Sequence, residues 1–369
     1  MKRNARVKIH RWLLPASWLY GAGVWLRNKL FDWGWLRERS FDAPVLCVGN
    51  LAVGGTGKTP HTEYLVRLLE EQGIHVAVLS RGYRRRTRGY VLATPESTVG
   101  SIGDEPLQLK TKYPDIRVAV DADRCHGIDR LLALTNPPVE AIVLDDAYQH
   151  RYVQAGWNIL LTDFSRLYCD DALLPAGRLR EPEAGSTRAQ MVVVTKCPPD
   201  LTAEACDRIA ARLRLGPEQQ LFFSTLCYGR LYRLDGAGTL SLADLRTREL
   251  EVLVLTGIAV PTPLVEEVER HAQSVELMAY PDHHAYSTAD LKRVEARFRR
   301  LAKGRRIVVT TEKDAARLRR HPALPEDVRP YIYVLPLEVK ILQEKQEAFN
   351  QNIIAYVREN SRNGIFPQK

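Results

Sequence analysis

The chain has 369 residues, more than one typical domain, and its 45% hydrophobic and 26% charged residues exclude a disordered tail or a collagen-like fibre. The formal net charge is +9, but residues 1–40 hold nine basic and two acidic side chains, so the rest of the chain is almost neutral. This distribution argues against nucleic acid as a partner. The six cysteines form no CxxC pair, which indicates reduced thiols in a cytosolic compartment.

The first segment combines an uncharged run with basic flanks. Residues 12–26 carry no charge, and five of the six tryptophans lie within the first 35 residues. A helix over this run spans roughly 22 Å, short of the ~30 Å hydrocarbon core of a bilayer. Because tryptophan prefers the bilayer boundary and basic residues prefer anionic headgroups, residues 1–35 are interpreted as an amphipathic anchor lying on a membrane. A signal peptide would need a clear cleavage site, which is missing, and a buried core helix is the alternative.

Beyond residue 44 the pattern becomes that of an α/β protein. Short apolar runs alternate with amphipathic stretches, the first of which covers 59–72 and stops at Gly73. Continuous apolar strands separated by helices predict a parallel sheet covered on both faces. The expected strands are 45–48, 76–79, 118–120, 142–144, 159–161 and 192–194.

A change of pattern at 220–235 marks a β-strand connector with a hairpin-like turn. A second α/β series follows, with strands expected at 252–255, 275–279, 307–309 and 331–335, helices at 261–272 and 287–301, and a final amphipathic stretch at 344–358. The sequence therefore predicts an anchor over 1–35, a core domain over 36–225 and a smaller α/β domain over 226–369 that closes over a cleft. The last helix of this smaller domain is also able to pack back on the core.

A glycine-rich loop follows the first expected strand and leads into a helix. Residues 52–59 match the P-loop pattern G-x-x-x-x-G-K-T, except that Ala52 replaces the first glycine. Such a loop binds phosphate through backbone N–H groups and a lysine, and its hydroxyl residue holds Mg²⁺. The core is therefore expected to resemble P-loop NTPases. The predicted phosphate-binding residues are Gly54, Gly55, Thr56, Gly57, Lys58 and Thr59.

An acidic pair ends the expected strand at 142–144. Asp145 and Asp146 are suited, with Thr59, to hold Mg²⁺ directly or through water, although a turn or helix cap would explain one of the two carboxylates. Gln149 and His150 follow and are candidates to orient the metal shell or the acceptor. Residues 195–198 lack the Asn and Asp of the guanine-binding N-K-x-D motif, so ATP is expected rather than GTP.

Seven blocks of residues occur in an order that is typical of one family. They are 49–60, 80–83 (SRGY), 103–106 (GDEP), 145–150, 174–182, 280–284 (YPDHH) and 310–314 (TTEKD). Together they closely resemble the tetraacyldisaccharide 4'-kinases of the lipid A pathway in Gram-negative bacteria, over nearly the whole chain. The resemblance implies transfer of the ATP γ-phosphate to the 4'-hydroxyl of a tetraacylated glucosamine disaccharide 1-phosphate, giving lipid IV-A.

The resemblance also implies a membrane-associated enzyme whose nucleotide cleft lies between two domains, at the cytoplasmic face of the inner membrane. Within that cleft Asp104 is the candidate general base, and the matching family aspartate pairs with a histidine that is His283 here. Because His283 belongs to the second domain, the base is expected to be oriented only when the domains close. Lys58 completes the catalytic set, and Glu105 is either a Mg²⁺ ligand or an exposed loop acid.

The acceptor is expected to meet a basic and aromatic surface. The candidates are Arg81, Tyr83, Arg124, Gln149, His150 and Arg180. The basic run at 84–88 either docks the acceptor's 1-phosphate or the membrane, or is a solvated loop. Glu312 and Asp314 open a helix and are explained by N-terminal capping and the helix dipole.

Two other functions are compatible with a P-loop beside an apolar N-terminal segment. One is a kinase of a soluble acceptor, in which the N-terminal segment is a core helix. The other is a nucleotide-dependent switch on a membrane surface, which would leave the 103–106 and 280–284 blocks without a role.

Overall fold

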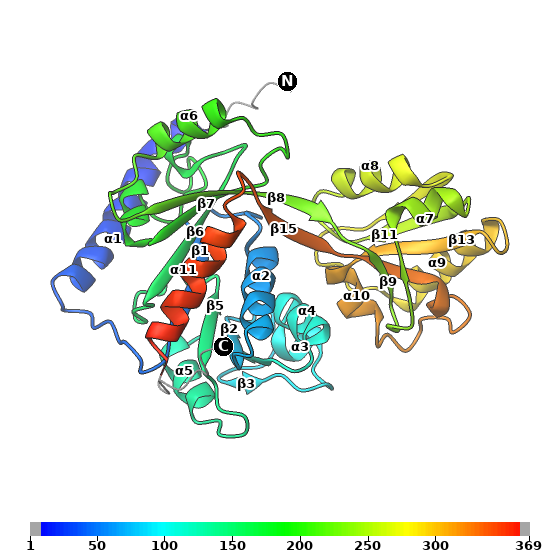
Figure 1. The fold of residues 1–369 in the computed structure, drawn as a ribbon, viewed down its shortest axis with the longest axis horizontal. Helices are drawn as coiled ribbons and strands as arrows, with labels where there is room; N and C mark the ends of the chain where they lie inside the picture. Colours follow the sequence, from blue (N-terminus) through cyan, green and yellow to red (C-terminus); the bar gives the residue numbers. More distant parts are fainter. Residues whose placement is uncertain (1–8, 362–369) are drawn as a thin grey trace.

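The computed structural model describes residues 9–361, and its strands form two sheets that are each covered by helices on both faces (Figure 1). The basic residues among 1–8, which belong to the predicted anchor, lie outside the described residues. The expected α/β fold with a P-loop sheet and a second, smaller α/β unit is confirmed, and every strand and helix predicted from periodicity is present.

The larger sheet, here called the P-loop sheet, has the strand order β15-β8-β7-β6-β1-β5-β2-β4-β3. All neighbours are parallel except the pairs β3–β4 and β8–β15. Its strands are β1 (Val45–Asn50), β2 (Val76–Ser80), β3 (Val91–Leu92), β4 (Arg117–Val120), β5 (Ala141–Asp145), β6 (Trp157–Asp163), β7 (Met191–Thr195), β8 (Gln220–Tyr228) and β15 (Leu337–Ile341). Because β1 lies between β5 and β6, the chain changes direction across the sheet beside β1, which is where parallel sheets place ligand sites.

Two apolar layers cover the P-loop sheet. One contains α2 (Lys58–Glu71), α3 (Val99–Ile102), α4 (Asp104–Lys112) and α11 (Gln346–Glu359), and the other contains α5 (Arg124–Leu132) and α6 (Ala203–Leu213). The 3-10 helices η1 (Arg11–Leu13), η2 (Tyr168–Asp170) and η3 (Glu183–Arg188) lie in connecting segments. The C-terminal helix α11 returns to this core, where Phe349 and Ile353 are buried.

The smaller sheet has the order β10-β9-β14-β13-β11-β12. Its strands are β9 (Leu231–Arg233), β10 (Thr239–Leu240), β11 (Glu251–Thr256), β12 (Ser274–Ala279), β13 (Arg306–Thr311) and β14 (Ile332–Leu335). Helices α7 (Leu242–Thr247) and α8 (Thr262–His271) cover one face, and α9 (Thr288–Arg300) and α10 (Glu312–Leu318) cover the other. The 3-10 helix η4 (Arg329–Tyr331) precedes β14.

Two adjacent strands connect the sheets (Figure 1). The chain leaves the P-loop sheet after β8 and returns to it along β15, and the two strands are paired antiparallel from Leu337 opposite Tyr228 to Ile341 opposite Ser224. The connector is therefore a two-stranded ribbon. The β connector expected at 220–235 supplies its first strand, β8, and the expected hairpin-like turn joins β9 to β10.

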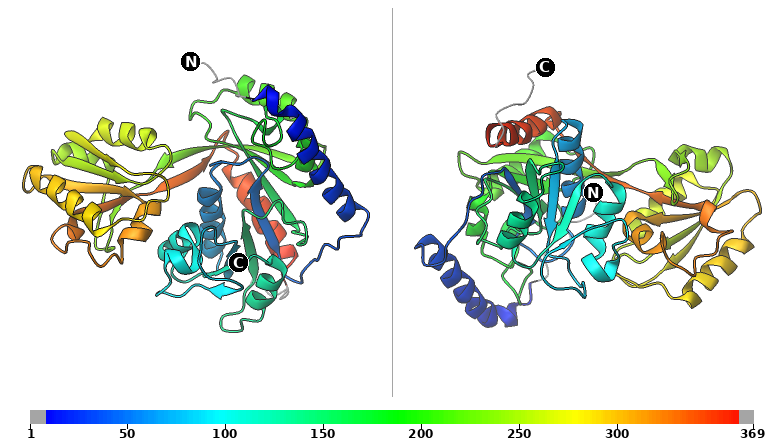
Figure 2. Two further views of the ribbon diagram at one scale, coloured as in Figure 1. Left: turned by 180° about the vertical axis from the view of Figure 1, so that it is seen from behind. Right: turned by 90° about the horizontal axis from the view of Figure 1, so that it is seen from below.

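Helix α1 (Leu14–Asp32) lies on the side of the P-loop domain that faces away from the smaller sheet (Figure 2). Its inner side is held by polar contacts: Ser17 Oγ donates to the carbonyl of Leu173 at 2.9 Å, and Tyr20 Oη donates to the carbonyl of Arg180 at 2.9 Å. No helix among residues 9–361 is long and apolar enough to cross a bilayer.

Helices α4 and α10 pack against each other and join the two sheets. Lys112 of α4 lies between two buried carboxylates, 2.6 Å from Glu63 of α2 and 2.7 Å from Glu312 of α10. Capping does not account for Glu312, because the cap of α10 is the Thr311 side chain, which accepts from the backbone N–H of Asp314. Glu312 instead forms an ion pair with Lys112, which joins α10 of the smaller unit to α4 of the P-loop unit.

Removal of Lys112 is expected to destabilise this contact strongly. Lys112→Met leaves Glu63 and Glu312 facing each other without a cation, and breaking a buried pair from one side costs about 3–5 kcal/mol. The measurement is the free energy of unfolding from denaturant titration, with exposed Lys340→Met as the control. Adding Glu312→Gln to Lys112→Met should recover part of the loss, and equal stabilities for Lys112→Met and Lys340→Met would contradict this role.

Candidate active site

The predicted P-loop closes the carboxyl end of β1 and begins α2. Gly57 caps α2 with φ 86° and Gly54 has φ 116°, backbone conformations that side chains with a Cβ rarely adopt. Thr56 is fixed from two sides, because Asn50 Nδ2 donates to its hydroxyl at 2.9 Å and Thr195 Oγ1 donates to its carbonyl at 2.8 Å. The loop is thus a preformed turn at a helix N-terminus, suited to a phosphate.

Lys58 faces the end of β5 across this loop. Its ammonium lies 3.7 Å from Asp146 Oδ1 and 3.5 Å from Asn50 Oδ1. Arg180 reaches the same two oxygens, with Nη2 3.1 Å from Asp146 and 2.6 Å from Asn50. Two cations therefore converge on one carboxylate beside the P-loop, a charge pattern that suits phosphoryl groups.

Three predicted metal ligands are close enough to influence one another. Burial raises the pKa of Asp145 to about 7, with further contributions from the negative charges of Glu105 and Asp146. Burial likewise raises the pKa of Glu105, which Lys58 and Lys313 oppose. A divalent cation would relieve this repulsion between carboxylates, so the donor set fits Mg²⁺.

No group of three or more His, Cys, Asp or Glu residues within 9–361 is arranged to hold a metal ion. This finding is compatible with a P-loop magnesium site, because there Mg²⁺ takes much of its oxygen shell from nucleotide phosphates and water. Thr59, the predicted hydroxyl ligand, is the second residue of α2. Asp145 is fixed by the Thr62 hydroxyl, which donates to its Oδ1 at 3.1 Å.

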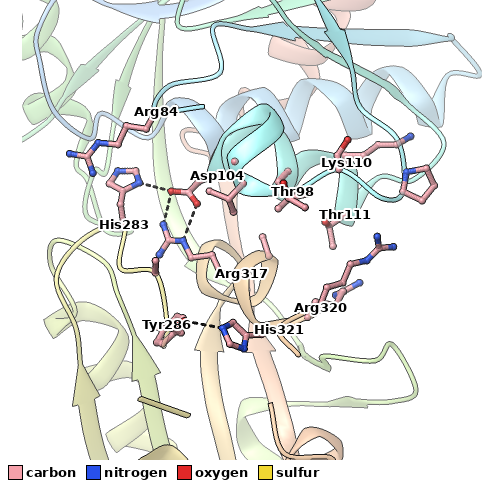
Figure 3. A pocket seen from close by; sticks show the side chains of 18 of the residues that line it. Arg84, Thr98, Asp104, Lys110, Thr111, His283, Tyr286, Arg317, Arg320 and His321 are labelled. Atoms are coloured by element: carbon pink, nitrogen blue, oxygen red, sulfur yellow. Dashed lines mark hydrogen bonds and ion pairs between the residues drawn. The ribbon is translucent and has the colours of Figure 1, made fainter. Parts of the chain in front are cut away.

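Asp104, at the start of α4, contacts His283, in the loop that follows β12 of the smaller sheet (Figure 3). His283 Nδ1 lies 2.6 Å from Asp104 Oδ2, and Arg317 of α10 holds the same carboxylate with Nε 2.9 Å from Oδ1 and Nη2 2.6 Å from Oδ2. Burial would raise the pKa of Asp104, but the hydrogen bonds from Arg317 and His283 outweigh burial and hold it below the usual range. Asp104 is therefore ionised at neutral pH.

The outer face of His283 is also occupied. Its Nε2 lies 3.2 Å from the ammonium of Lys313, which donates to Asp282 Oδ1 at 2.8 Å. His283 adopts a left-handed backbone conformation with φ 62°, which is uncommon for a residue other than glycine and is concentrated at functional sites.

The other acceptor candidates fall into two groups. Tyr83 is 62% exposed with its ring 6.3 Å from that of His283, and Arg81 is also exposed. Arg124 is 3% exposed and donates to the carbonyls of Asp121 and Ala122, at 3.2 and 2.9 Å. Burial lowers the pKa of Arg124, and the charge of Arg81 adds to that shift.

Gln149 and His150 lie between α1 and the P-loop. Gln149 Nε2 donates to the backbone carbonyl of Asn50 at 2.8 Å, and the backbone carbonyl of Gln149 accepts from Arg27 of α1 at 3.0 Å. Burial lowers the pKa of His150 to about 4, and the charge of Arg124 contributes, so its ring is neutral. Through Gln149, the loop that follows β5 therefore connects α1 to Asn50 beside the P-loop.

Three further residues belong to the site, although the sequence did not single them out. Asn50 bonds to Thr56, Lys58 and Arg180, Arg317 bonds to Asp104, and Lys313 contacts His283. Asn50 and Lys313 lie inside blocks that carry the resemblance. A signal for Arg317 was its position on α10, one helical turn after Lys313, which places both side chains on one face.

Comparison with known proteins identifies the family. A family model described as tetraacyldisaccharide-1-P 4'-kinase matches residues 9–358. The chain belongs to this family. A tetraacyldisaccharide 4'-kinase of Bacteroides fragilis is 58% identical over 100% of this chain and 98% of its own length. One of Bacteroides thetaiotaomicron is 53% identical over 98% and 97%. A crystal structure of LpxK from Aquifex aeolicus in complex with ATP has a TM-score of 0.72 and 28% identity, and the match covers 94% of this chain and 99% of that chain.

Membership in this family decides between the functions left open by the sequence. The protein is a kinase that phosphorylates a hydroxyl group, in lipid A biosynthesis, and neither a kinase of a soluble acceptor nor a membrane switch. The resemblance inferred from the seven blocks is confirmed.

Proposed function

We propose that the reaction takes place where α4, which covers the P-loop sheet, meets two parts of the smaller unit, the 282–284 loop and α10. The γ-phosphate of ATP is transferred there to the 4'-hydroxyl of a tetraacylated glucosamine disaccharide 1-phosphate. The observation that carries this assignment is the contact of Asp104 with His283 across the two sheets, beside a P-loop. The two-stranded β8–β15 ribbon is the hinge along which the smaller unit closes.

The P-loop residues bind and orient the nucleotide. Backbone N–H groups of Gly54, Gly55, Thr56 and Gly57 surround the phosphates, and Lys58 stabilises negative charge that develops on the γ-phosphoryl group. Arg180 supplies a second cation, held against Asp146 and Asn50. Thr59, Asp145, Asp146 and Glu105 would hold Mg²⁺, which neutralises phosphate charge when bound.

Asp104 and His283 act on the acceptor. The 4'-oxygen forms a bond to the γ-phosphorus, the bond from that phosphorus to the bridging oxygen breaks, and ADP leaves. The hydroxyl proton passes to the Asp104–His283 pair. Because the pair is assembled from both sheets, it forms only in the closed state, which limits transfer of the phosphoryl group to water.

Incubation with γ-labelled ATP and a detergent-dispersed tetraacyl disaccharide 1-phosphate tests this function. We expect label in the lipid, and partial hydrolysis should place it at the 4'-position of the distal sugar. Label confined to inorganic phosphate would contradict the proposed function.

Helix α1 presents an apolar surface that fits a membrane boundary. Trp18 is 71% exposed, Leu19 79% and Trp25 54%, and Trp12 and Leu26 lie along the same side at heptad spacing. We propose that this surface inserts among inner-membrane lipids on the cytoplasmic face, where ATP is available, so that the enzyme binds the membrane peripherally. The polar contacts of Tyr20 and Arg27 then hold the active site close to that surface.

Replacing Trp18, Leu19 and Trp25 together with serine should weaken membrane binding by at least about tenfold, because the buried apolar area sets the strength of interfacial binding. Co-sedimentation with vesicles that contain anionic lipid measures the effect. A matched triple variant replaces Val260, Leu277 and Tyr331, which are exposed apolar residues of the smaller unit, with serine. Equal binding by the two variants would contradict the role of α1.

A further inference from the structure

His61 is a buried histidine in the first turn of α2, next to the P-loop. Its side chain is almost inaccessible to solvent, and both of its ring nitrogens have partners. Nδ1 lies 2.7 Å from the backbone carbonyl of Gly57, and Nε2 lies 3.0 Å from the hydroxyl of Ser224 in β8. The ring therefore connects the P-loop to the first strand of the two-stranded ribbon.

The two partners fix the protonation of the His61 ring. A backbone carbonyl only accepts hydrogen bonds, so Nδ1 carries the proton and donates to Gly57. Nε2 then has a free electron pair, which accepts from the hydroxyl of Ser224. Burial lowers the pKa of His61 to about 4, although the hydrogen bond to Gly57 opposes this shift, so the ring is neutral at physiological pH. One neutral tautomer therefore makes both hydrogen bonds.

The Gly57 end of this connection belongs to the phosphate-binding surface. The Gly57 carbonyl accepts from Nδ1 of His61 and also, at 3.2 Å, from the backbone N–H of His61. The N–H of Lys58 belongs to the same peptide group and points away from that carbonyl, toward the open N-terminal end of α2. A phosphate bound at this end contacts that N–H. The orientation of one peptide is thus shared by the ligand on one side and His61 on the other.

The Ser224 end lies where the ribbon leaves the P-loop sheet. Strand β8 is paired with β7 from Gln220 to Phe223 and with β15 from Ser224 to Tyr228. Ser224 is thus the first residue of β8 beyond the pairing with β7, and it lies opposite Ile341 of β15. It is fully buried, and α2 also packs against β15 (Figure 1). A hydrogen bond at Ser224 therefore acts at the base of the ribbon that carries the smaller unit.

We propose that His61 is a positioning residue that couples nucleotide binding at the P-loop to closure of the smaller unit. This inference rests on the proposed function, in which the ribbon is the hinge. Both hydrogen bonds of the ring are present in the same structure in which Asp104 contacts His283. A phosphate that fixes the Gly57 peptide also fixes the ring, and through Ser224 it favours this placement of the ribbon. ATP binding therefore promotes assembly of the Asp104–His283 pair.

His61→Phe keeps a buried ring and removes both hydrogen bonds. We expect kcat with ATP and the tetraacyl disaccharide 1-phosphate to fall at least about fivefold, because each hydrogen bond between neutral groups changes an equilibrium by about 2–10-fold. Hydrogen–deuterium exchange with and without a non-hydrolysable ATP analogue measures the coupling itself. In the parent enzyme the analogue should slow exchange at 54–59 in the P-loop and at 224–228 and 337–341 in the ribbon. In His61→Phe it should slow exchange in the P-loop alone.

A double variant separates coupling from stability. His61→Phe leaves the Ser224 hydroxyl without its acceptor, whereas adding Ser224→Ala removes both polar partners, so the melting temperature should return close to that of the parent. The kcat and the ribbon exchange of the double variant should stay as in His61→Phe. Tyr64→Phe is the matched control, because it removes a 2.7 Å hydrogen bond from α2 to Asn350 of α11. This control should keep the parent kcat and the parent response to the analogue.

The outcomes distinguish this inference from the proposed function. If the parent enzyme phosphorylates no lipid, the proposed function itself fails. If the parent is active but the analogue does not slow exchange in its ribbon, the coupling role is overturned and the proposed function stands. The same holds if either His61 variant keeps the parent kcat or the ribbon response. Recovery of kcat together with the melting temperature in the double variant would show that His61 contributes only to stability, and would also overturn the inference.

Discussion

Replacing Asp104 or His283 with alanine should lower kcat by two or more orders of magnitude while the affinity for ATP changes little. General-base catalysis contributes about 10²–10⁴-fold, and neither side chain contacts the P-loop. Loss of Asp104 also leaves Arg317 and His283, two groups that donate to it, without their shared acceptor. Steady-state kinetics with the lipid acceptor, together with nucleotide binding by calorimetry, separates the two effects.

The double variant sharpens this prediction. Residues that act as a unit are not additive, so Asp104→Ala combined with His283→Ala should be no slower than the slower single variant within a fewfold. The matched control is His271→Ala, which changes a surface histidine on α8. Near-normal turnover in either single variant, or losses that multiply in the double variant, would contradict the assignment of a coupled pair.

Lys58→Met should lower kcat by about 10²–10³-fold, the usual cost of removing one preorganised donor to transition-state charge. Lys58→Arg should not restore full activity. The lysine acts as a compact point charge near Asp146 and Asn50, and the guanidinium of Arg180 already contacts the same two oxygens, so a second guanidinium would compete for them. The measurement is kcat at saturating ATP and lipid, with Lys303→Met in an exposed turn as the control. A kcat within tenfold of the parent value would contradict the role of Lys58.

The local pattern of the sequence predicted most of the fold. Continuous apolar runs identified the strands on either side of β1, because a strand that is buried on both faces carries apolar side chains at successive positions. Strand β15 was missed because its significance is non-local: Leu337–Ile341 pairs with β8, more than a hundred residues earlier in the chain. The periodicity of apolar residues contains no information about a distant pairing partner, so β15 could be assigned to the connector only from the structure.

In the candidate site, too, local motifs could be predicted from the sequence and long-range contacts could not. Lys58, Asp145 and Asp146 could be predicted because the P-loop and the acidic strand end are local motifs with a known chemistry. The pairing of Asp104 with His283 was expected only from the family resemblance, and the structure brings the two side chains into contact. Arg317 and Lys112 were not identified, because an arginine or lysine on an amphipathic helix is usually a solvated side chain. Their partners Asp104 and Glu312 come from the other sheet in each case.

The stereochemistry at phosphorus tests the central claim most directly. The proposed reaction is one direct transfer from ATP to the 4'-oxygen, in which Asp104 and His283 accept a proton and never the phosphoryl group. ATP made chiral at the γ-phosphorus should therefore give lipid with inverted configuration. Retention of configuration would show two successive transfers through a phosphorylated side chain, and it would contradict the base role given to the Asp104–His283 pair.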